Sequence, residues 1–227
     1  MSRVVSLFIL LFVSVQLSAQ FPSQKWYPGE VELTDNTFRQ GQIKYNLERD
    51  VIQVQVKGRT ETYSPAQVIS FNIRTVQRGK RKEKPASVTR VFYSLPFANE
   101  NGYKRMQFFE VIIEGKATLL AREYITTVTT NAGNRLNRNR RFRGGTFNDP
   151  QVITRQVLAH RMYLGSLDGT IKQLPSKRKD VLFMLKEHQS TLKEFAKEEK
   201  LKLNELYDMA RLIQQFNVVS TQHSKVY

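Results

Sequence analysis

The chain has 227 residues and a formal net charge of +16, with 36 Lys and Arg residues against 20 Asp and Glu residues. It contains no cysteine, which excludes disulfides, thiol catalysis, zinc–thiolate sites and iron–sulfur clusters. The length is sufficient for one large domain or two small ones that bury a core without covalent cross-links.

The start of the chain has the pattern of a secretory signal peptide. Arg3 provides an early positive charge, residues 4–15 are apolar apart from two serines, and small residues follow at Ser18 and Ala19. The apolar run is too short to cross a bilayer, which takes about 20 residues, and this order of charge, apolar run and small residues is typical of a cleaved signal. We therefore expect cleavage after Ala19, so that residues 1–19 are removed. The mature chain is then soluble and located in the periplasm or at the outer membrane and cell surface.

Residues 26–73 alternate between apolar and polar side chains in short runs. Gly41 lies inside one run and indicates a bulge or a close backbone approach. Short alternating runs at spacings of about ten residues predict an antiparallel sheet or barrel. The turn residues between the runs are Asp35-Asn36, Lys57-Gly58 and Ser64-Pro65.

Longer strands follow in the second part of this β-rich region. Residues 106–130 have the pattern of a hairpin with its turn at 114–116, and residues 151–174 add two strands around a turn at 168–169. These patterns predict a β-rich domain over residues 20–175, built as a small barrel or as sandwich-like sheets.

The periodicity changes to that of helices from Ser176. Apolar residues at helical spacing predict two or three amphipathic helices over residues 176–217 that pack on the β-structure. Thr191 with Glu194 has the pattern of a capping box, and Asn204 is suited to cap a third helix. We expect residues 218–227 to form a flexible tail, and the fold class to be α+β.

Most of the positive charge lies in three short segments. Residues 78–84 carry +4, residues 131–145 carry +5 and residues 177–179 carry +3, which together make +12 of the +15 left when Arg3 is removed. The first two lie in predicted loops, at 78–84 and 131–150. Such a loop can contact an anionic partner, can bind nucleic acid, or can be solvated without a ligand. The candidate contact residues are Arg78, Lys80, Arg81, Lys82, Arg135, Arg138, Arg140, Arg141 and Arg143.

Five stretches of the chain resemble a known group of proteins. They are GEVELTDNTFRQGQIKYN (29–46), YSPAQVISF (63–71), FFEVIIEGKATLLARE (108–123), YLGSLDGTIKQL (163–174) and KDVLFML (179–185). In this order they resemble uncharacterised exported β-rich proteins of Bacteroidetes-type bacteria. The resemblance implies a periplasmic or cell-surface setting in a Gram-negative organism, and it brings no catalytic residues with it.

Few residues are arranged for catalysis or metal binding. The histidines, His160, His188 and His223, are far apart and form no HxH or HExxH motif. The nucleophile motif GxSxG and the phosphate loops GxGxxG and GxxxxGK[ST] are also absent. Glu110 and Glu114 are four residues apart, on one face of an extended strand, and Glu110 is the candidate for a glycan hydrolase that uses two carboxylates.

Taken together, the sequence predicts a non-catalytic exported envelope protein that acts as an interaction or assembly module. We expect no cofactor, and a partner that is an acidic protein or an anionic envelope component, with peripheral membrane contact open. The alternative is a polyanion or nucleic-acid binder, which export disfavours, and a less favoured alternative is an envelope glycan hydrolase.

Overall fold

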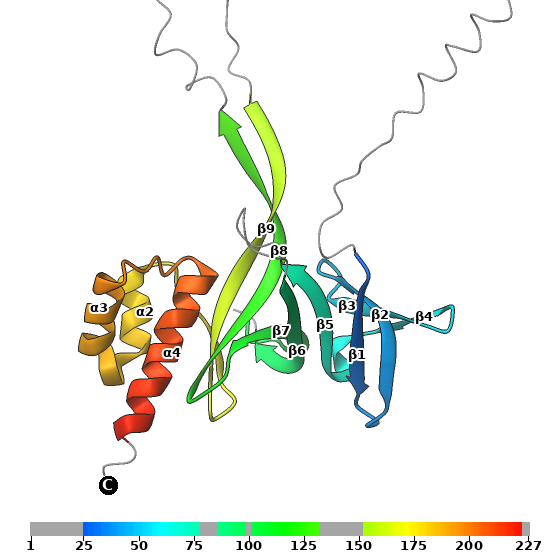
Figure 1. Ribbon diagram of the computed structural model, residues 1–227, viewed down its shortest axis with the longest axis horizontal. Coiled ribbons are helices and arrows are strands. Elements are labelled where there is room, and N and C mark those ends of the chain that lie inside the picture. Colours follow the sequence, from blue (N-terminus) through cyan, green and yellow to red (C-terminus); the bar gives the residue numbers. More distant parts are fainter. Residues whose placement is uncertain (1–24, 78–85, 99–100, 132–151, 224–227) are drawn as a thin grey trace, which may run out of the picture.

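The computed structural model describes residues 25–77, 86–98, 101–131 and 152–223 (Figure 1). Its strands are β1 (Tyr27–Leu33), β2 (Phe38–Asn46), β3 (Val51–Val56), β4 (Arg59–Tyr63), β5 (Val68–Gln77), β6 (Ala86–Ala98), β7 (Lys104–Ile113), β8 (Ala117–Asn131), β9 (Val152–Ser166) and β10 (Ile171–Gln173). Its helices are the short 3-10 helices η3 (Pro65–Gln67) and η5 (Lys186–His188) and the α-helices α2 (Arg178–Met184), α3 (Gln189–Glu198) and α4 (Leu206–His223).

All of these strands join one antiparallel sheet, in the order β10-β9-β8-β7-β6-β5-β1-β2-β3-β4. The three α-helices gather beside β8 and β9, at the end of the sheet away from β1–β4 (Figure 1). The prediction of an α+β fold, β-rich first and helical at the end, is confirmed. The described β-region is a single open sheet rather than two stacked sheets.

The turns form where the sequence placed them, because turn residues specify the backbone locally. Asn36 adopts a left-handed φ of 61° between β1 and β2. Lys57 and Gly58 have φ of 47° and 81°, the pattern of a two-residue hairpin turn. Gly41 pairs with Gly29 across β1 and β2, and a side chain at Gly41 would collide with the backbone carbonyl of Gln55. The close backbone approach predicted at Gly41 is therefore confirmed.

The sheet curls strongly around an aromatic core. The ring centroids of Tyr45 on β2 and Phe108 on β7 are 5.7 Å apart, although three strands separate β2 from β7 in the sheet. A flat sheet would separate them by about 19 Å, four strand spacings. Tyr45 also contacts Phe71 and Phe92, which stack on each other with centroids 4.5 Å apart. Apolar side chains that alternate along the strands complete this core: Val31, Leu33, Ile43, Ile52, Val54, Val68 and Ile73.

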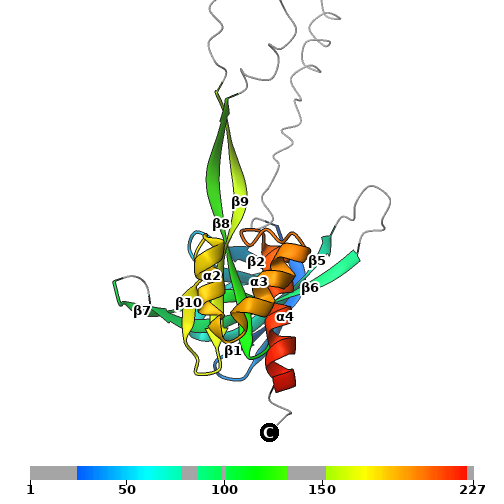
Figure 2. The same ribbon diagram turned by 90° about the vertical axis from the view of Figure 1, so that its left-hand side faces the viewer.

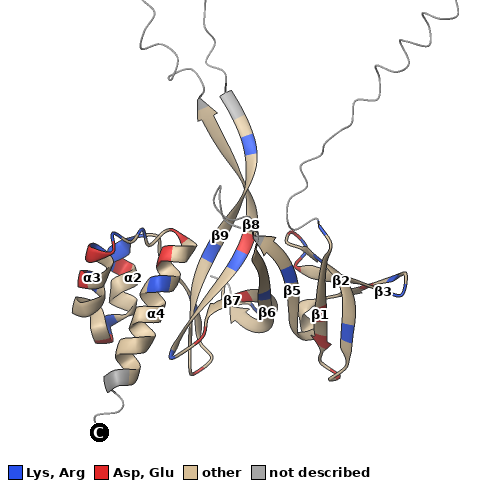
Figure 3. Ribbon diagram, viewed as in Figure 1, with Lys and Arg blue, Asp and Glu red and all other residues tan. Residues whose placement is uncertain are grey.

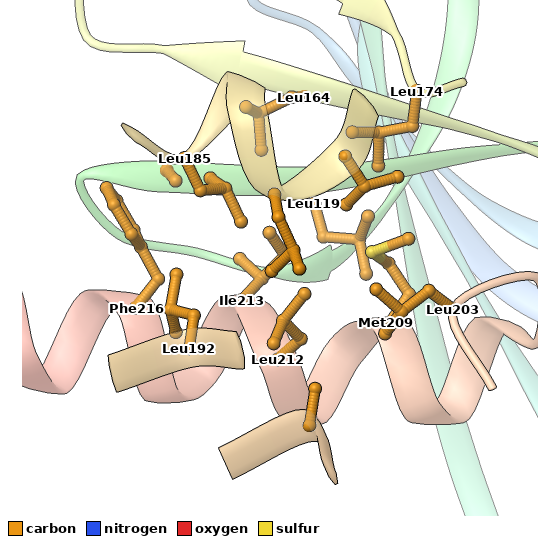
Figure 4. Close-up of a cluster of buried hydrophobic side chains, with 14 of the residues drawn as sticks. Leu119, Leu164, Leu174, Leu185, Leu192, Leu203, Met209, Leu212, Ile213 and Phe216 are labelled. Carbon is orange, nitrogen blue, oxygen red and sulfur yellow. The ribbon is translucent and has the colours of Figure 1, made fainter. Parts of the chain in front are cut away.

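A second core lies between the helices and β8–β9 (Figure 4). Leu119 of β8 and Leu164 of β9 face the helices, whereas their neighbours Leu120 and Tyr163 join a small cluster with Phe109. This alternation follows from the period of two along a strand. The helices and the turn after α2 contribute the fully or nearly fully buried side chains Val181, Leu182, Leu185, Leu192, Ala196, Met209, Leu212, Ile213 and Phe216.

The helix ends differ from the predicted ones. Thr191 lies inside α3, whose N-cap is His188, and Asn204 lies two residues before α4 begins. α4 continues to His223, so the predicted tail is helical over residues 218–223, and residues 224–227 lie outside the described part of the chain. The helix continues because Ser220, one turn beyond Phe216, is also buried and extends the stripe that faces the core.

Asn217 attaches α4 to the turn between β7 and β8. Its Oδ1 accepts a hydrogen bond from the backbone N–H of Ala117 at 2.9 Å, and its Nδ2 donates to the carbonyl of Ala117 at 2.9 Å. A side chain at Gly115 would collide with Asn217, so the glycine permits this close approach. The amide thereby satisfies two backbone groups that no strand partner reaches.

We expect Asn217→Ala to lower the free energy of unfolding by about 1–3 kcal/mol, because it leaves the nearly buried N–H and C=O of Ala117 without partners. Urea denaturation followed by circular dichroism measures this change. Gln214→Ala is the matched control, since Gln214 is exposed on the same helix, and we expect it to change stability by less than about 0.5 kcal/mol. Equal effects of the two substitutions would contradict the role of Asn217.

Candidate functional site

The candidate contact residues of the two basic loops all lie outside the described residues. Their attachment points are described. Gln77 pairs with Ala86 at the ends of β5 and β6, and Asn131 pairs with Val152 at the ends of β8 and β9. Each basic segment therefore connects two neighbouring antiparallel strands, and its contact with a partner stays a prediction.

Within the described residues, basic side chains converge on a pocket of about 730 Å³ formed by strands β6 to β10. This volume lies in the range of ligand sites, about 300–1,000 Å³. The pocket is lined by Arg105 of β7, Arg122 of β8, Arg161 of β9 and Lys172 of β10, and none of the described residues that line it is acidic. Figure 3 shows basic segments on β8 and β9 in this part of the sheet. We refer to it as the basic pocket.

Two of these arginines are direct neighbours across the sheet. Arg122 on β8 pairs with Arg161 on β9 in the antiparallel register. Like charges directly opposite each other destabilise a sheet, so this pair requires compensation. Arg161 is placed over the ring of Tyr124, with its guanidinium carbon 4.5 Å from the ring centroid, which is a favourable cation–π geometry.

Arg122 is compensated by a counter-ion and by hydrogen bonding. Its Nη2 lies 3.0 Å from Oδ2 of Asp50, in the turn between β2 and β3, and its Nη1 donates to the side-chain oxygen of Gln107 on β7. Its Nε is buried and has no hydrogen-bond partner among the described residues. Arg122 is thus fixed in place by the fold, and its charge is largely balanced by Asp50.

The other three cations are not balanced in this way. Arg105, Arg161 and Lys172 are exposed and form no ion pair within the described chain. Tyr163 also lines the pocket. Burial raises the pKa of its phenol, and the positive charges of Arg122 and Arg161 oppose that rise. Together with the apolar Phe97 and the amide of Gln107, the site can hold an anionic group through charge-assisted hydrogen bonds.

A partly buried ion-pair cluster joins β6, β7, β8 and β9. Arg90 donates from Nε and Nη2 to the two carboxylate oxygens of Glu110, at 2.7 and 2.6 Å, and its Nη2 also lies 2.8 Å from Glu123. His160, which faces Glu123 across the strands, lies 3.4 Å from the same carboxylate. Burial alone would lower the pKa of Arg90, but its bonds to the two carboxylates raise it.

This arrangement bears on the hydrolase alternative. Glu110 is buried and both of its oxygens are bonded to Arg90, whereas Glu114 lies in the exposed β7–β8 turn. Glu123, the carboxylate that shares Arg90, has a lowered pKa: burial raises it, but the hydrogen bond from His160 and the charge of Arg90 outweigh that effect. A general acid needs a raised pKa, so the cluster has the chemistry of a structural ion pair.

The described residues contain no group of three or more His, Asp or Glu side chains that could hold a metal ion. His160 belongs to the ion-pair cluster, and the ring of His188 lies against Phe216, with centroids 5.8 Å apart.

Sequence reasoning did not single out the basic pocket, because its four cations come from four strands. Arg105, Arg122, Arg161 and Lys172 are far apart along the chain, and none belongs to one of the three basic segments. The pairing of Arg122 with Arg161 would have indicated the pocket, but it can be identified only when the register of β8 and β9 is known.

Comparisons of the chain with protein-family models, with curated proteins and with solved structures give no match.

We expect Glu123→Gln to flatten the dependence of stability on pH in acid. Since the pKa of Glu123 is lowered in the folded state, its contribution is fully present above the unfolded value of about 4.3 and is lost as the pH falls through the lower folded value. The wild-type chain should therefore lose stability below about pH 4 more steeply than the variant. Urea denaturation between pH 3 and 7 measures both slopes.

Glu198→Gln is the control for this experiment, because Glu198 is exposed on α3. It should keep the wild-type slope. Parallel curves for the wild type and Glu123→Gln would show that the ion-pair cluster does not couple to pH.

Proposed function

We propose that this protein is a non-catalytic exported envelope protein that docks an anionic partner, with the basic pocket as its binding site. The partner presents a carboxylate, phosphate or sulfate group on an acidic protein or on an anionic envelope component. The observation that carries the proposal is the convergence of Arg105, Arg161 and Lys172 on one pocket, without a balancing acid among its described lining residues.

The distribution of burial and charge supports binding rather than stability as the role of these cations. Arg122, which the fold requires, has its counter-ion in Asp50. The other three would cost little in stability if they were absent, since exposed surface charges contribute about 0–1 kcal/mol. Unbalanced arginines around a concave site favour recognition of planar anions, which they bind with two parallel hydrogen bonds.

The same interpretation accounts for the two basic loops. Each connects the ends of neighbouring strands, and their cations would add to the positive field of the whole protein, which increases the rate of encounter with an anionic partner. Nucleic acid is the alternative ligand for such a field, and the apolar start of the chain, with its signal-peptide pattern, favours an envelope partner instead. In the described part of the chain, no helix has the length and apolar character needed to cross a bilayer.

We expect the triple variant Arg105→Gln, Arg161→Gln, Lys172→Gln to bind anionic probes at least about tenfold more weakly than the wild type, because each lost charge-assisted hydrogen bond contributes about 1.5–3 kcal/mol. The probes are a polyglutamate peptide, a polyuronate and vesicles containing phosphatidylglycerol, titrated against the full chain by calorimetry at several salt concentrations. Duplex DNA is included as the probe for the alternative function.

The control is Lys193→Gln, Lys197→Gln, Lys202→Gln, which removes the same charge from exposed positions near α3. It should reduce affinity by less than about threefold through the long-range field alone. Equal losses in the two triple variants would remove the pocket from the proposal. Tightest binding to DNA, with a salt slope near −0.9 for each phosphate contacted, would favour the nucleic-acid alternative.

We also expect the chain to be cleaved and exported. After expression in a Gram-negative host, mass spectrometry of the protein in the envelope fraction should give an amino terminus at Gln20. Leu10→Arg with Leu11→Arg interrupts the apolar run and should retain the uncleaved chain in the cytoplasm. An intact amino terminus on a cytoplasmic wild-type chain would overturn the assignment to the envelope.

A further inference from the structure

The outer parts of β8 and β9 form a two-stranded arm that pairs with no other strand of the described chain. β7 pairs with β8 only as far as Ala121, and β10 pairs with β9 only as far as Tyr163. Residues 122–131 and 152–161 pair only with each other. Two views at right angles show the arm extending away from the rest of the described residues (Figures 1 and 2). Among the described residues, no strand therefore lies beside the backbone groups on either edge of the arm.

The outer half of the arm has few of the features that protect a free strand edge. Residues 125–131 and 152–158 contain no proline, Arg155 is their only charged residue, and their pairing shows no register shift. Most of their side chains are β-branched, which favours strands. The far edge of the sheet, β4, instead carries Arg59 and Glu61. Because isolated two-stranded ribbons are only marginally stable in water, an added strand would stabilise this one.

The edge formed by β8 is complementary to itself. Residues 126–130 read TTVTT, which is the same in both directions around Val128. When two copies of β8 lie antiparallel and centred on Val128, Thr126 of one copy faces Thr130 of the other, and the remaining threonines match likewise. Threonine pairs across strands are favourable, and no charge opposes a like charge.

The edge formed by β9 is not complementary to itself. Arg155 is the partner of Val128 across the arm and lies at the centre of the corresponding stretch of β9. Pairing two β9 edges about this point would place Arg155 opposite its own copy, which is destabilising. The sequence thus leaves one edge open and protects the other with a charge, a known means of preventing strand addition.

We propose that the β8 edge of the arm is a self-association surface, on which a second copy of this chain adds its own β8 in antiparallel pairing over residues 125–131. The same surface is used by both copies around a twofold axis, which gives a closed dimer. In this antiparallel pairing the two copies of Asn131 lie at opposite ends of the paired strands. The interface is small compared with the standard size of about 1,600 Å², and the dimer is therefore reversible. It is independent of the basic pocket.

A cysteine cross-link tests the central pair. The natural chain has no cysteine, so Val128→Cys introduces the only thiol. Directly paired side chains have Cβ atoms about 4.5–5.5 Å apart, close to disulfide geometry. Under mild oxidation the full-chain variant should form a disulfide-linked dimer. Thr154→Cys, on β9 of the same arm, is the matched control and should stay monomeric, because three strand spacings, about 14 Å, separate the two copies of that position.

A charge exchange tests the pairing without a covalent bond. Thr127→Lys with Thr129→Lys places lysine opposite lysine in the dimer, and should weaken self-association by about tenfold or more, as measured by analytical ultracentrifugation. Gln156→Lys with Thr154→Lys puts the same charges on the same face of the arm, one strand away, and should have little effect. Mixing the lysine variant with Thr127→Glu, Thr129→Glu should restore dimers that contain one copy of each.

Restored mixed dimers confirm the proposal and show that the variants are folded. A wild-type chain that sediments as a monomer at all concentrations up to about 1 mM would overturn it. Equal cross-linking at positions 128 and 154, or failure of the oppositely charged variants to pair, would overturn it as well.

Discussion

The curl of the sheet depends on one contact between strands that are far apart in the sheet order. Arg122 of β8 pairs with Asp50 in the β2–β3 turn, and the hydroxyl of Tyr45 donates to the same carboxylate at 2.6 Å. The ring of Tyr45 lies in the aromatic core, so one residue joins the apolar interior to the ion pair. Since the side chains of Arg122 and Asp50 are only 20% and 13% exposed, removing either partner would leave an uncompensated charge in a site of low dielectric constant.

Because of this contact, the charge of Arg122 is used in the fold, whereas the other cations of the basic pocket keep their charge for binding. Arg122 lines the basic pocket, but Asp50 balances it and Gln107 fixes its orientation. The excess positive potential comes from the exposed cations at Arg105, Arg161 and Lys172. A pocket built in this way holds one arginine rigidly at its base and keeps the others free to adjust to a ligand, which lowers the entropy cost at the fixed contact.

Local features of the sequence predicted the strands and turns, and non-local features limited the prediction. The hairpin turns at Asn36 and at Lys57-Gly58 follow from residues that tolerate left-handed φ. Glu110, in contrast, was assigned to a candidate catalytic pair because its partner Arg90 is twenty residues away on a different strand. The spacing of apolar residues predicts a helical segment that ends at residue 217, whereas α4 continues to His223 and buries Ser220. Burial of a polar side chain is decided by packing and is not visible in the periodicity of apolar residues.

The basic pocket could not be predicted from runs of charge for a related reason. It depends on where β7 and β8 stop pairing. Beyond Ala121, β8 continues with β9 alone, while β7 follows β6, with Arg105 opposite Phe97 and Gln107 opposite Leu95.

The divergence of these two strands has two consequences at once. Arg105 and Gln107 on β7 are separated from the ladder of β8, and the space between them becomes the pocket that Arg122 and Arg161 line from the other side. The same divergence leaves the edge of β8 without a neighbour over the uncharged stretch TTVTT. A β7–β8 ladder continued in the same register would fill the pocket, but because β7 begins at Lys104 it would reach only Thr127 on β8. The basic pocket and the free edge of β8 thus both begin where β7 and β8 stop pairing, but most of the edge lies beyond the reach of β7 and is a separate surface.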